Sequence, residues 1–188
     1  MSAEADDRTL PAPAGTVATQ FVRVLARAPR WVGVVLFIAW SALMFALSAQ
    51  PEPAVGRILR PLGAWAHNSM HAPEYAVFAG LFLWATTRAG GKLTATSARI
   101  WLCAAVVLVW GASDEWHQSF TPGRDSSLCD VLTDICGGVS AALLVRAAEV
   151  GASAARMLSL VVLAVLACAL AALIATLLPA TRPDLTWL

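Results

Sequence analysis

Three short groups of ionisable and amide side chains in this sequence are spaced like the turns of a helix. They are His67, His71 and Glu74, then Asp114, His117 and Gln118, and finally Asp130 with Asp134. Residues three, four or seven positions apart lie on one face of an α-helix, so each group would form a polar stripe. Carboxylates and imidazoles in such stripes can act as general acids and bases, or can bind a metal ion or another ligand.

The helices that must position these stripes are predicted to lie in a membrane. Hydrophobic residues make up 59% of the 188 residues and charged residues only 13%, whereas a soluble domain carries about 25% charge. The mean hydropathy is +0.69. A net charge of +1 without a basic block excludes a nucleic-acid-binding protein, and four scattered cysteines exclude a disulfide scaffold. The composition predicts an all-α, polytopic helical bundle that is embedded in the lipid bilayer and has the bilayer as a partner.

The apolar runs predict about five transmembrane helices. Residues 31–51 and 157–181 are long enough to cross alone. Three shorter runs must include polar neighbours, because each rises only about 20 Å against a hydrocarbon core of about 30 Å. These runs are residues 75–87, 100–113 and 131–145. A cleaved signal peptide is the alternative for the first run, although that run exceeds the usual apolar stretch of about 7 to 15 residues. The first and fifth helices are expected to be apolar walls.

The positions of Lys and Arg predict a cytoplasmic N-terminus. With five spans, nine basic residues fall on the N-terminal side of the membrane and four on the other side. The nine are Arg8, Arg23, Arg27, Arg30, Arg88, Lys92, Arg99, Arg146 and Arg156, and the four are Arg57, Arg60, Arg124 and Arg182. Basic residues are enriched in cytoplasmic segments. We therefore predict a disordered cytoplasmic tail (1–28), a transmembrane domain (29–181) and a short extracytoplasmic tail (182–188).

This topology brings the stripes to one depth near the outer face. Helix rise places Glu74, Asp114 and the aspartates of the fourth helix about 18 to 24 Å above the basic inner ends of their helices. A carboxylate that faces lipid costs at least about 2.5 to 3.5 kcal/mol. We therefore expect the stripes to face one another in a polar pocket between helices two, three and four.

The connection between the third and fourth helices is expected to close this pocket. Pro122-Gly123 fits the centre of a type II turn, which would leave Arg124 at the mouth of the pocket. Ser127 and Asp130 resemble a capping box that would start the fourth helix. Further along that helix, Gly137-Gly138 with Ala141-Ala142 forms a small-residue face suited to close helix contact.

Two motifs resemble the VanZ-like family of small bacterial membrane proteins. Residues 113–138, SDEWHQSFTPGRDSSLCDVLTDICGG, are similar to the family signature, and His71-Ala-Pro-Glu74-Tyr75 is similar to its His-x-x-Glu-Tyr element. The chain departs from the family at His67-Asn68, where Arg-Lys is common, and at Ala72, where an aromatic residue is common. The family is named after a protein linked to teicoplanin resistance. The resemblance implies a cell-envelope protein that binds or modifies a lipid-linked or glycopeptide ligand at the outer leaflet.

Candidate roles follow from the stripes and the resemblance together. The candidates for proton chemistry are His71, Glu74, Asp114, His117 and Asp134, and those for ligand binding are Tyr75, Gln118, Arg124 and Asp130. Arg124 would bind an anionic group through paired hydrogen bonds. Glu115 points about 100° away from Asp114, so a solvent or loop contact is expected for it.

Several alternatives stay open at this point. His71 and His117 with carboxylates could hold zinc or manganese, but no HExxH motif is present, so no metal ligand or cofactor is assigned. The chain could be an enzyme or a non-catalytic assembly or binding factor. A small transporter or proton relay is less favoured because no inverted repeat is visible. The polar groups could also pair only to fasten the bundle, and an oligomer is left open.

Overall fold

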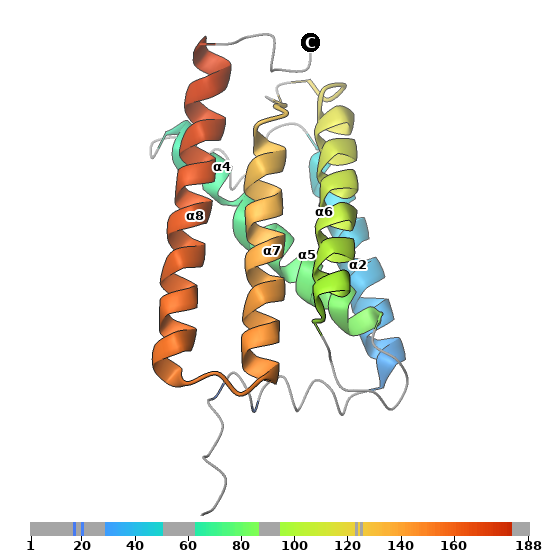
Figure 1. The fold of residues 1–188 in the computed structure, drawn as a ribbon. Helices are drawn as coiled ribbons and strands as arrows, with labels where there is room; N and C mark the ends of the chain where they lie inside the picture. Colours follow the sequence, from blue (N-terminus) through green and yellow to red (C-terminus); the bar gives the residue numbers. More distant parts are fainter. Residues whose placement is uncertain are drawn as a thin grey trace, which may run out of the picture.

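The structure, a computed structural model, describes residues 17, 20, 29–50, 63–86, 95–122, 124 and 126–181. Within these residues the fold is all-helical, as predicted (Figure 1). The helices are α2 (Arg30–Ser48), α4 (Ala64–Ser69), α5 (His71–Ala85), α6 (Ser97–Gln118), α7 (Asp130–Glu149) and α8 (Ala154–Thr181). The two predicted tails, apart from residues 17 and 20, lie outside the described residues.

Four of these helices are long and apolar enough to cross a membrane. They are α2, α6, α7 and the part of α8 from Ala154 to Leu178. The polar neighbours predicted to extend the middle helices are included, because α6 runs on to Gln118 and α7 begins at Asp130. Helix α5 has 15 residues and rises only about 22 Å. A fifth crossing, formed by α5 with α4 before it, therefore stays a prediction.

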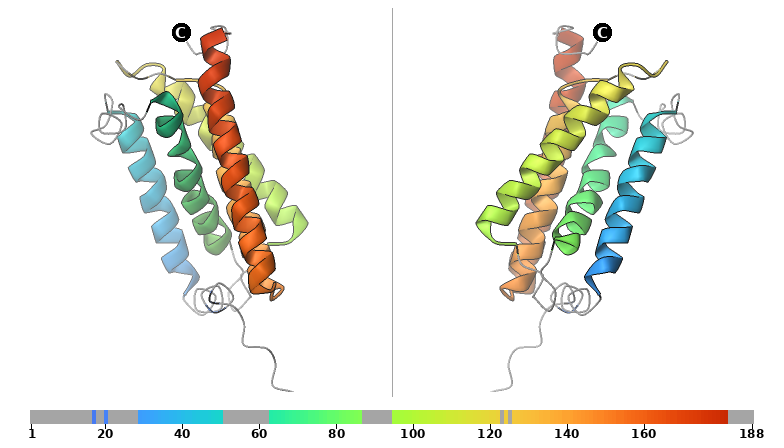
Figure 2. Two further views of the ribbon diagram at one scale, coloured as in Figure 1. Left: turned by 90° about the vertical axis from the view of Figure 1, so that its left-hand side faces the viewer. Right: turned by 90° about the vertical axis from the view of Figure 1, so that its right-hand side faces the viewer.

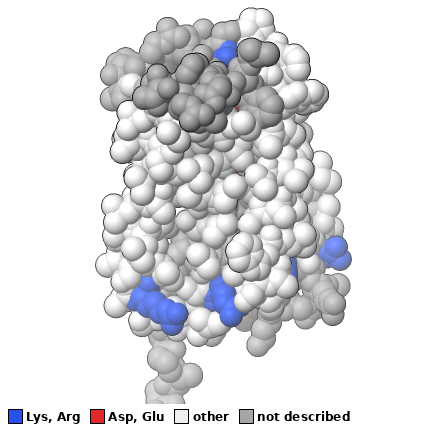
Figure 3. All heavy atoms as spheres, turned by 45° about the horizontal axis from the view of Figure 1, so that its top comes forward, with Lys and Arg blue, Asp and Glu red and all other residues white. Residues whose placement is uncertain are grey.

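The outer surface of the bundle is apolar, as a lipid-facing surface must be. Trp101 is 76% exposed, Val109 69% and Leu158 66%. A soluble monomer rarely exposes large apolar side chains over such extended surfaces. Figure 3 shows a largely uncharged face between the two ends of the bundle. These features fit an integral membrane protein.

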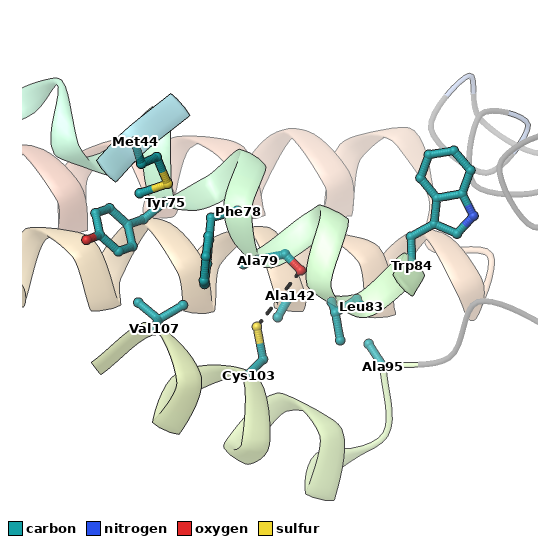
Figure 4. Close-up of a cluster of buried hydrophobic side chains, with 10 residues drawn as sticks. All are labelled: Met44, Tyr75, Phe78, Ala79, Leu83, Trp84, Ala95, Cys103, Val107 and Ala142. Atoms are coloured by element: carbon teal, nitrogen blue, oxygen red, sulfur yellow. Dashed lines mark hydrogen bonds between the residues drawn. The ribbon is translucent and has the colours of Figure 1, made fainter. Parts of the chain in front are cut away.

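Helices α5 and α7 form the centre of the bundle. Helix α7 contacts α5, α6 and α8, and α5 also contacts α2 and α6, an arrangement that can be followed in Figures 1 and 2. The core lies along α5, where Tyr75, Phe78 and Leu83 are almost completely buried against α2 and α6 (Figure 4). The polar stripes thus belong to helices that pack directly on one another.

Small residues allow this close packing. A Cβ atom at Gly137 would overlap the backbone carbonyl of Ala72 on α5, and one at Gly138 would lie 2.7 Å from Val107 Cγ2 on α6. Ala142, one turn further, is fully buried. The predicted small-residue face of this helix is confirmed, and it is the surface on which α5 and α6 meet α7.

Arginines anchor the end of the bundle that lies lower in Figure 1. Arg30 Nε donates to Ala85 O at 2.9 Å and Arg99 Nη2 donates to Leu83 O at 2.6 Å. These carbonyls belong to the last turn of α5, where no intrahelical partner exists. Figure 3 shows basic side chains gathered mainly around this end, and the described residue Arg124 belongs to the opposite end. The asymmetry matches the distribution that predicted the orientation.

Candidate functional site

The polar stripes meet at the end of the bundle opposite the arginine anchors. The first turns of α5 and α7, the last turns of α6 and the connection between α6 and α7 lie together there (Figure 1). The buried polar side chains of these segments are Glu115, Gln118, Ser126, Ser127, Asp130, Thr133 and Asp134. Those that are half-buried are His71, Glu74, Asp114, His117 and Arg124. We call these twelve residues the polar cluster.

The first stripe is interrupted, contrary to the prediction. Helix α4 ends at Ser69 and α5 starts at His71, so His67 and His71 do not share one continuous helix. Pro73 lies in the first turn of α5, where its missing N–H removes no intrahelical bond. The side chain of His67 lies outside the described residues. His71 and Glu74 remain on one helix and both enter the polar cluster.

A direct contact between α5 and α7 is the centre of the cluster. His71 Nδ1 lies 3.0 Å from Asp134 Oδ1, and the Asp134 side chain is 1% exposed. Gly111 on α6 permits this arrangement, because a Cβ atom there would lie 2.5 Å from Asp134 Oδ2. The structure thus joins two of the candidates for proton chemistry through one hydrogen bond.

Glu115 belongs to the cluster although the sequence analysis left it out. It is 1% exposed, and its Oε2 accepts a hydrogen bond from the backbone N–H of Ser127 at 2.8 Å. The predicted loop contact is therefore correct, but it is a buried one. Glu115 also interacts electrostatically with His71, Asp130 and Asp134. The sequence could have indicated this role, because Glu115 directly follows Asp114 in the second motif.

The predicted capping box is wrong. Helix α7 begins at Asp130 after the N-cap residue Cys129, and no side chain caps it. Ser127 lies two residues before the N-cap, and its Oγ accepts from Cys129 N at 3.1 Å. Ser127 therefore orders the turn that leads into α7, which leaves the carboxylate of Asp130 directed to other groups of the cluster.

Asp114 and Glu74 form the more exposed part of the cluster. Gln118 Nε2 donates to Asp114 Oδ2 at 2.8 Å, as their spacing by four residues allows. Glu74 interacts electrostatically with His71, Asp114 and Arg124. The backbone carbonyl of Glu74 accepts a hydrogen bond from Trp40 Nε1 at 3.3 Å, which fixes the start of α5 to α2.

His117 faces α2 instead of the carboxylates of α7. Its ring stacks on Phe45 at a centroid distance of 4.5 Å, and its Nδ1 lies 3.4 Å from Ser48 Oγ. Thr121 Oγ1 reaches the Ser48 carbonyl nearby, at 3.5 Å. The first membrane helix is therefore more than an apolar wall, because it contacts the border of the polar cluster.

Tyr75 and Arg124 bring further polar atoms to the same end. Tyr75 is 1% exposed, and among the described residues its hydroxyl has no hydrogen-bond partner. Figure 4 shows the hydroxyl pointing away from the apolar residues of the core. Arg124 follows a turn closed by its N–H and Thr121 O at 3.2 Å. The type II geometry predicted for Pro122-Gly123 stays a prediction, because Gly123 lies outside the described residues.

One group of side chains has the composition and spacing of a metal site. A potential ligand atom from each of His71, Glu115 and Asp130 lies within 4.8 Å of the other two. The three residues come from α5, α6 and α7. Of the two histidines considered from the sequence, His71 belongs to this group and His117 does not, because His117 contacts α2.

Comparison of the chain with protein-family models, with curated proteins and with solved structures finds no match.

Proposed function

We propose that this chain is a VanZ-like membrane protein of the cell envelope. In this proposal its polar cluster lies near the outer leaflet and binds the polar part of a lipid-linked or glycopeptide ligand. The orientation follows from the excess of basic residues at the other end of the bundle. The proposal concerns binding, and it assigns no reaction to the site.

The charge imbalance of the cluster carries this proposal. Four carboxylates besides Asp130, those of Glu74, Asp114, Glu115 and Asp134, lie at one end of three packed helices. The described basic groups that interact with them are His71 and Arg124. Buried ionisable groups that only fasten a bundle need matched partners, because an uncompensated buried charge is costly. Acids in excess of bases favour a site that receives a further polar or cationic group.

The burial of the cluster divides it into two layers with different roles. Glu115, Asp130 and Asp134 are buried and hold the arrangement together, whereas Glu74, Asp114 and Arg124 are half-buried. The half-buried groups are the ones that a ligand entering from the membrane surface would reach first. Arg124 would bind an anionic group such as a phosphate or carboxylate, with two parallel hydrogen bonds.

A susceptibility assay tests this proposal. The full chain is expressed in a bacterial host that is sensitive to teicoplanin, and the inhibitory concentration is compared for wild type, Asp114→Asn and Arg124→Gln. Protein level in the membrane is measured by immunoblot. We expect wild type to raise the inhibitory concentration and both variants to lose the increase at normal protein level.

The matched control is Cys168→Ala, a half-buried position on α8 away from the cluster. It should behave as wild type. Equal resistance in wild type and both cluster variants would contradict a role for the cluster. No increase with well-expressed wild type would contradict the glycopeptide part of the proposal.

A further inference from the structure

We infer that His71, Glu115 and Asp130 form a binding site for a divalent transition-metal ion, with zinc or manganese as the fitting chemistry. This inference deepens the proposed function, because it names a cation that the acidic cluster would hold. The inference is drawn from side chains of three helices, and it does not require that the organic ligand be known. Metal binding and the resistance phenotype can therefore be measured separately.

The geometry of the three side chains suits a metal ion. Their potential ligand atoms lie within 4.8 Å of one another. The ligand atoms of a tetrahedral zinc ion lie roughly 3.4 Å apart, given metal-ligand distances of about 2.0 to 2.2 Å. Small side-chain rotations would close the group by about 1 to 1.5 Å around one centre. One imidazole with two carboxylates is a set of nitrogen and oxygen donors that zinc and manganese accept.

Asp134 is placed as the residue that orients the histidine ligand. Its Oδ1 lies 3.0 Å from His71 Nδ1. Metal-bound histidines commonly donate their second ring N–H to a carboxylate, which fixes the tautomer and the ring orientation. With Nδ1 directed to Asp134, Nε2 is the nitrogen that would bind the ion. Asp134 is thus a positioning residue in this inference.

Charge compensation gives a physical reason for a cation at this place. Glu115 is 1% exposed, and its carboxylate would be costly inside a bundle without a compensating charge. A divalent ion bound by two carboxylates and a neutral imidazole forms a site of zero net charge.

The hydroxyl of Tyr75 is a second observation that favours a further group in the cluster. It is buried and has no hydrogen-bond partner among the described residues. Asp134 Oδ2 has none there either, but this oxygen faces Gly111 on α6. Tyr75 interacts electrostatically with Asp134, Asp114, Glu74 and Glu115, so its phenol belongs to the polar side of α5. Buried polar atoms in proteins nearly always have a partner. Three protein ligands leave a coordination position for a water or a ligand oxygen, which a phenol can contact.

Metal analysis of the purified full-length protein tests the inference. The protein in detergent is stripped with a chelator, loaded with Zn²⁺ or Mn²⁺ and desalted, and metal per chain is measured by mass spectrometry. We expect about one ion per wild-type chain. His71→Ala, Glu115→Gln and Asp130→Asn should each lower the occupancy at least about tenfold at equal free metal, and Asp134→Asn should weaken affinity about 10- to 100-fold.

The matched control is Cys168→Ala, which removes a thiol on α8 outside the polar cluster and should leave the occupancy unchanged. X-ray absorption of the zinc-loaded wild type needs no variant, and it should show one imidazole with oxygen ligands and no sulfur. Wild type that retains neither metal overturns the inference, and so does binding that survives all three ligand substitutions. Metal binding without the resistance phenotype supports the metal site and contradicts the proposed organic ligand. Resistance conferred by a wild-type protein that binds neither metal supports the organic ligand and contradicts the metal site.

Discussion

Gly111 is the position where the packing of the bundle and the geometry of the polar cluster depend on each other most directly. In Gly111→Ala the new Cβ would lie 2.5 Å from Asp134 Oδ2 and 3.3 Å from its Cγ. An ordinary van der Waals contact requires the carboxylate or α6 to move by about 1 Å. The hydrogen bond between His71 and Asp134, 3.0 Å long, would then exceed about 3.5 Å and be lost.

The energetic consequence can be worked out against a matched substitution. Alanine in place of a helical glycine adds about 1 kcal/mol of stability through the backbone. Overpacking costs about 1 to 3 kcal/mol, and a lost hydrogen bond to a charged group costs about 1.5 to 3 kcal/mol. We expect Gly111→Ala to lose about 3 kcal/mol in total. Gly80→Ala, whose Cβ meets nothing within 4 Å, should gain about 1 kcal/mol.

Thermal unfolding in detergent, followed by tryptophan fluorescence, measures this difference. At about 2 to 4 °C per kcal/mol for a chain of this size, Gly80→Ala should raise Tm by a few degrees and Gly111→Ala should lower it by about 6 to 12 °C. The Gly111→Ala protein should also bind metal more weakly. A Tm for Gly111→Ala equal to or above that of Gly80→Ala would refute the close approach of α6 to Asp134.

Three other predictions follow from the same structure. Arg99→Gln should lower the free energy of unfolding by about 1.5 to 3 kcal/mol, because the last carbonyls of α5 lose a charged donor, and unchanged stability in a denaturant titration would contradict that anchor. Gly137→Ala should lower the yield of folded protein in size-exclusion chromatography, since its Cβ would overlap the Ala72 backbone, and a normal yield would argue against this helix contact. In a cysteine-free background, Phe120→Cys should react with a membrane-impermeant thiol reagent in intact cells and Ser153→Cys only after lysis, and the reverse pattern would reverse the orientation.

Much of the helical architecture could be predicted from the sequence. The apolar runs gave the long helices because their length is set by the thickness of a bilayer and their sequence pattern is continuous. The spacing of Asp130 and Asp134 by four residues placed both on one face, and both are buried. The small-residue face of α7 was also evident, because only small side chains allow the backbones to approach so closely.

The composition of the site was harder to predict, because it depends on which helix faces which. Helical spacing correctly separated Glu115 from Asp114, but it could not show that α7 and its preceding turn cover the Glu115 side. His117 follows Asp114 by three residues and was grouped with it. However, α2 packs against that edge of α6, and the imidazole contacts Phe45 and Ser48 of α2. The capping of α7 was misjudged for a related reason, since the Ser127 hydroxyl accepts from Cys129 N in the turn and caps no N–H of the helix.

The contact between His71 and Asp134 joins α5 to α7 at the centre of the polar cluster, and a double-mutant cycle tests it most directly. The free energy of unfolding is measured in detergent for metal-free wild type, His71→Ala, Asp134→Ala and the double variant. If α5 and α7 bring these side chains into a buried pair, the single losses will not add, and the coupling energy will be at least about 1 kcal/mol. Single effects that add to within about 0.5 kcal/mol would contradict the contact and the site built around it.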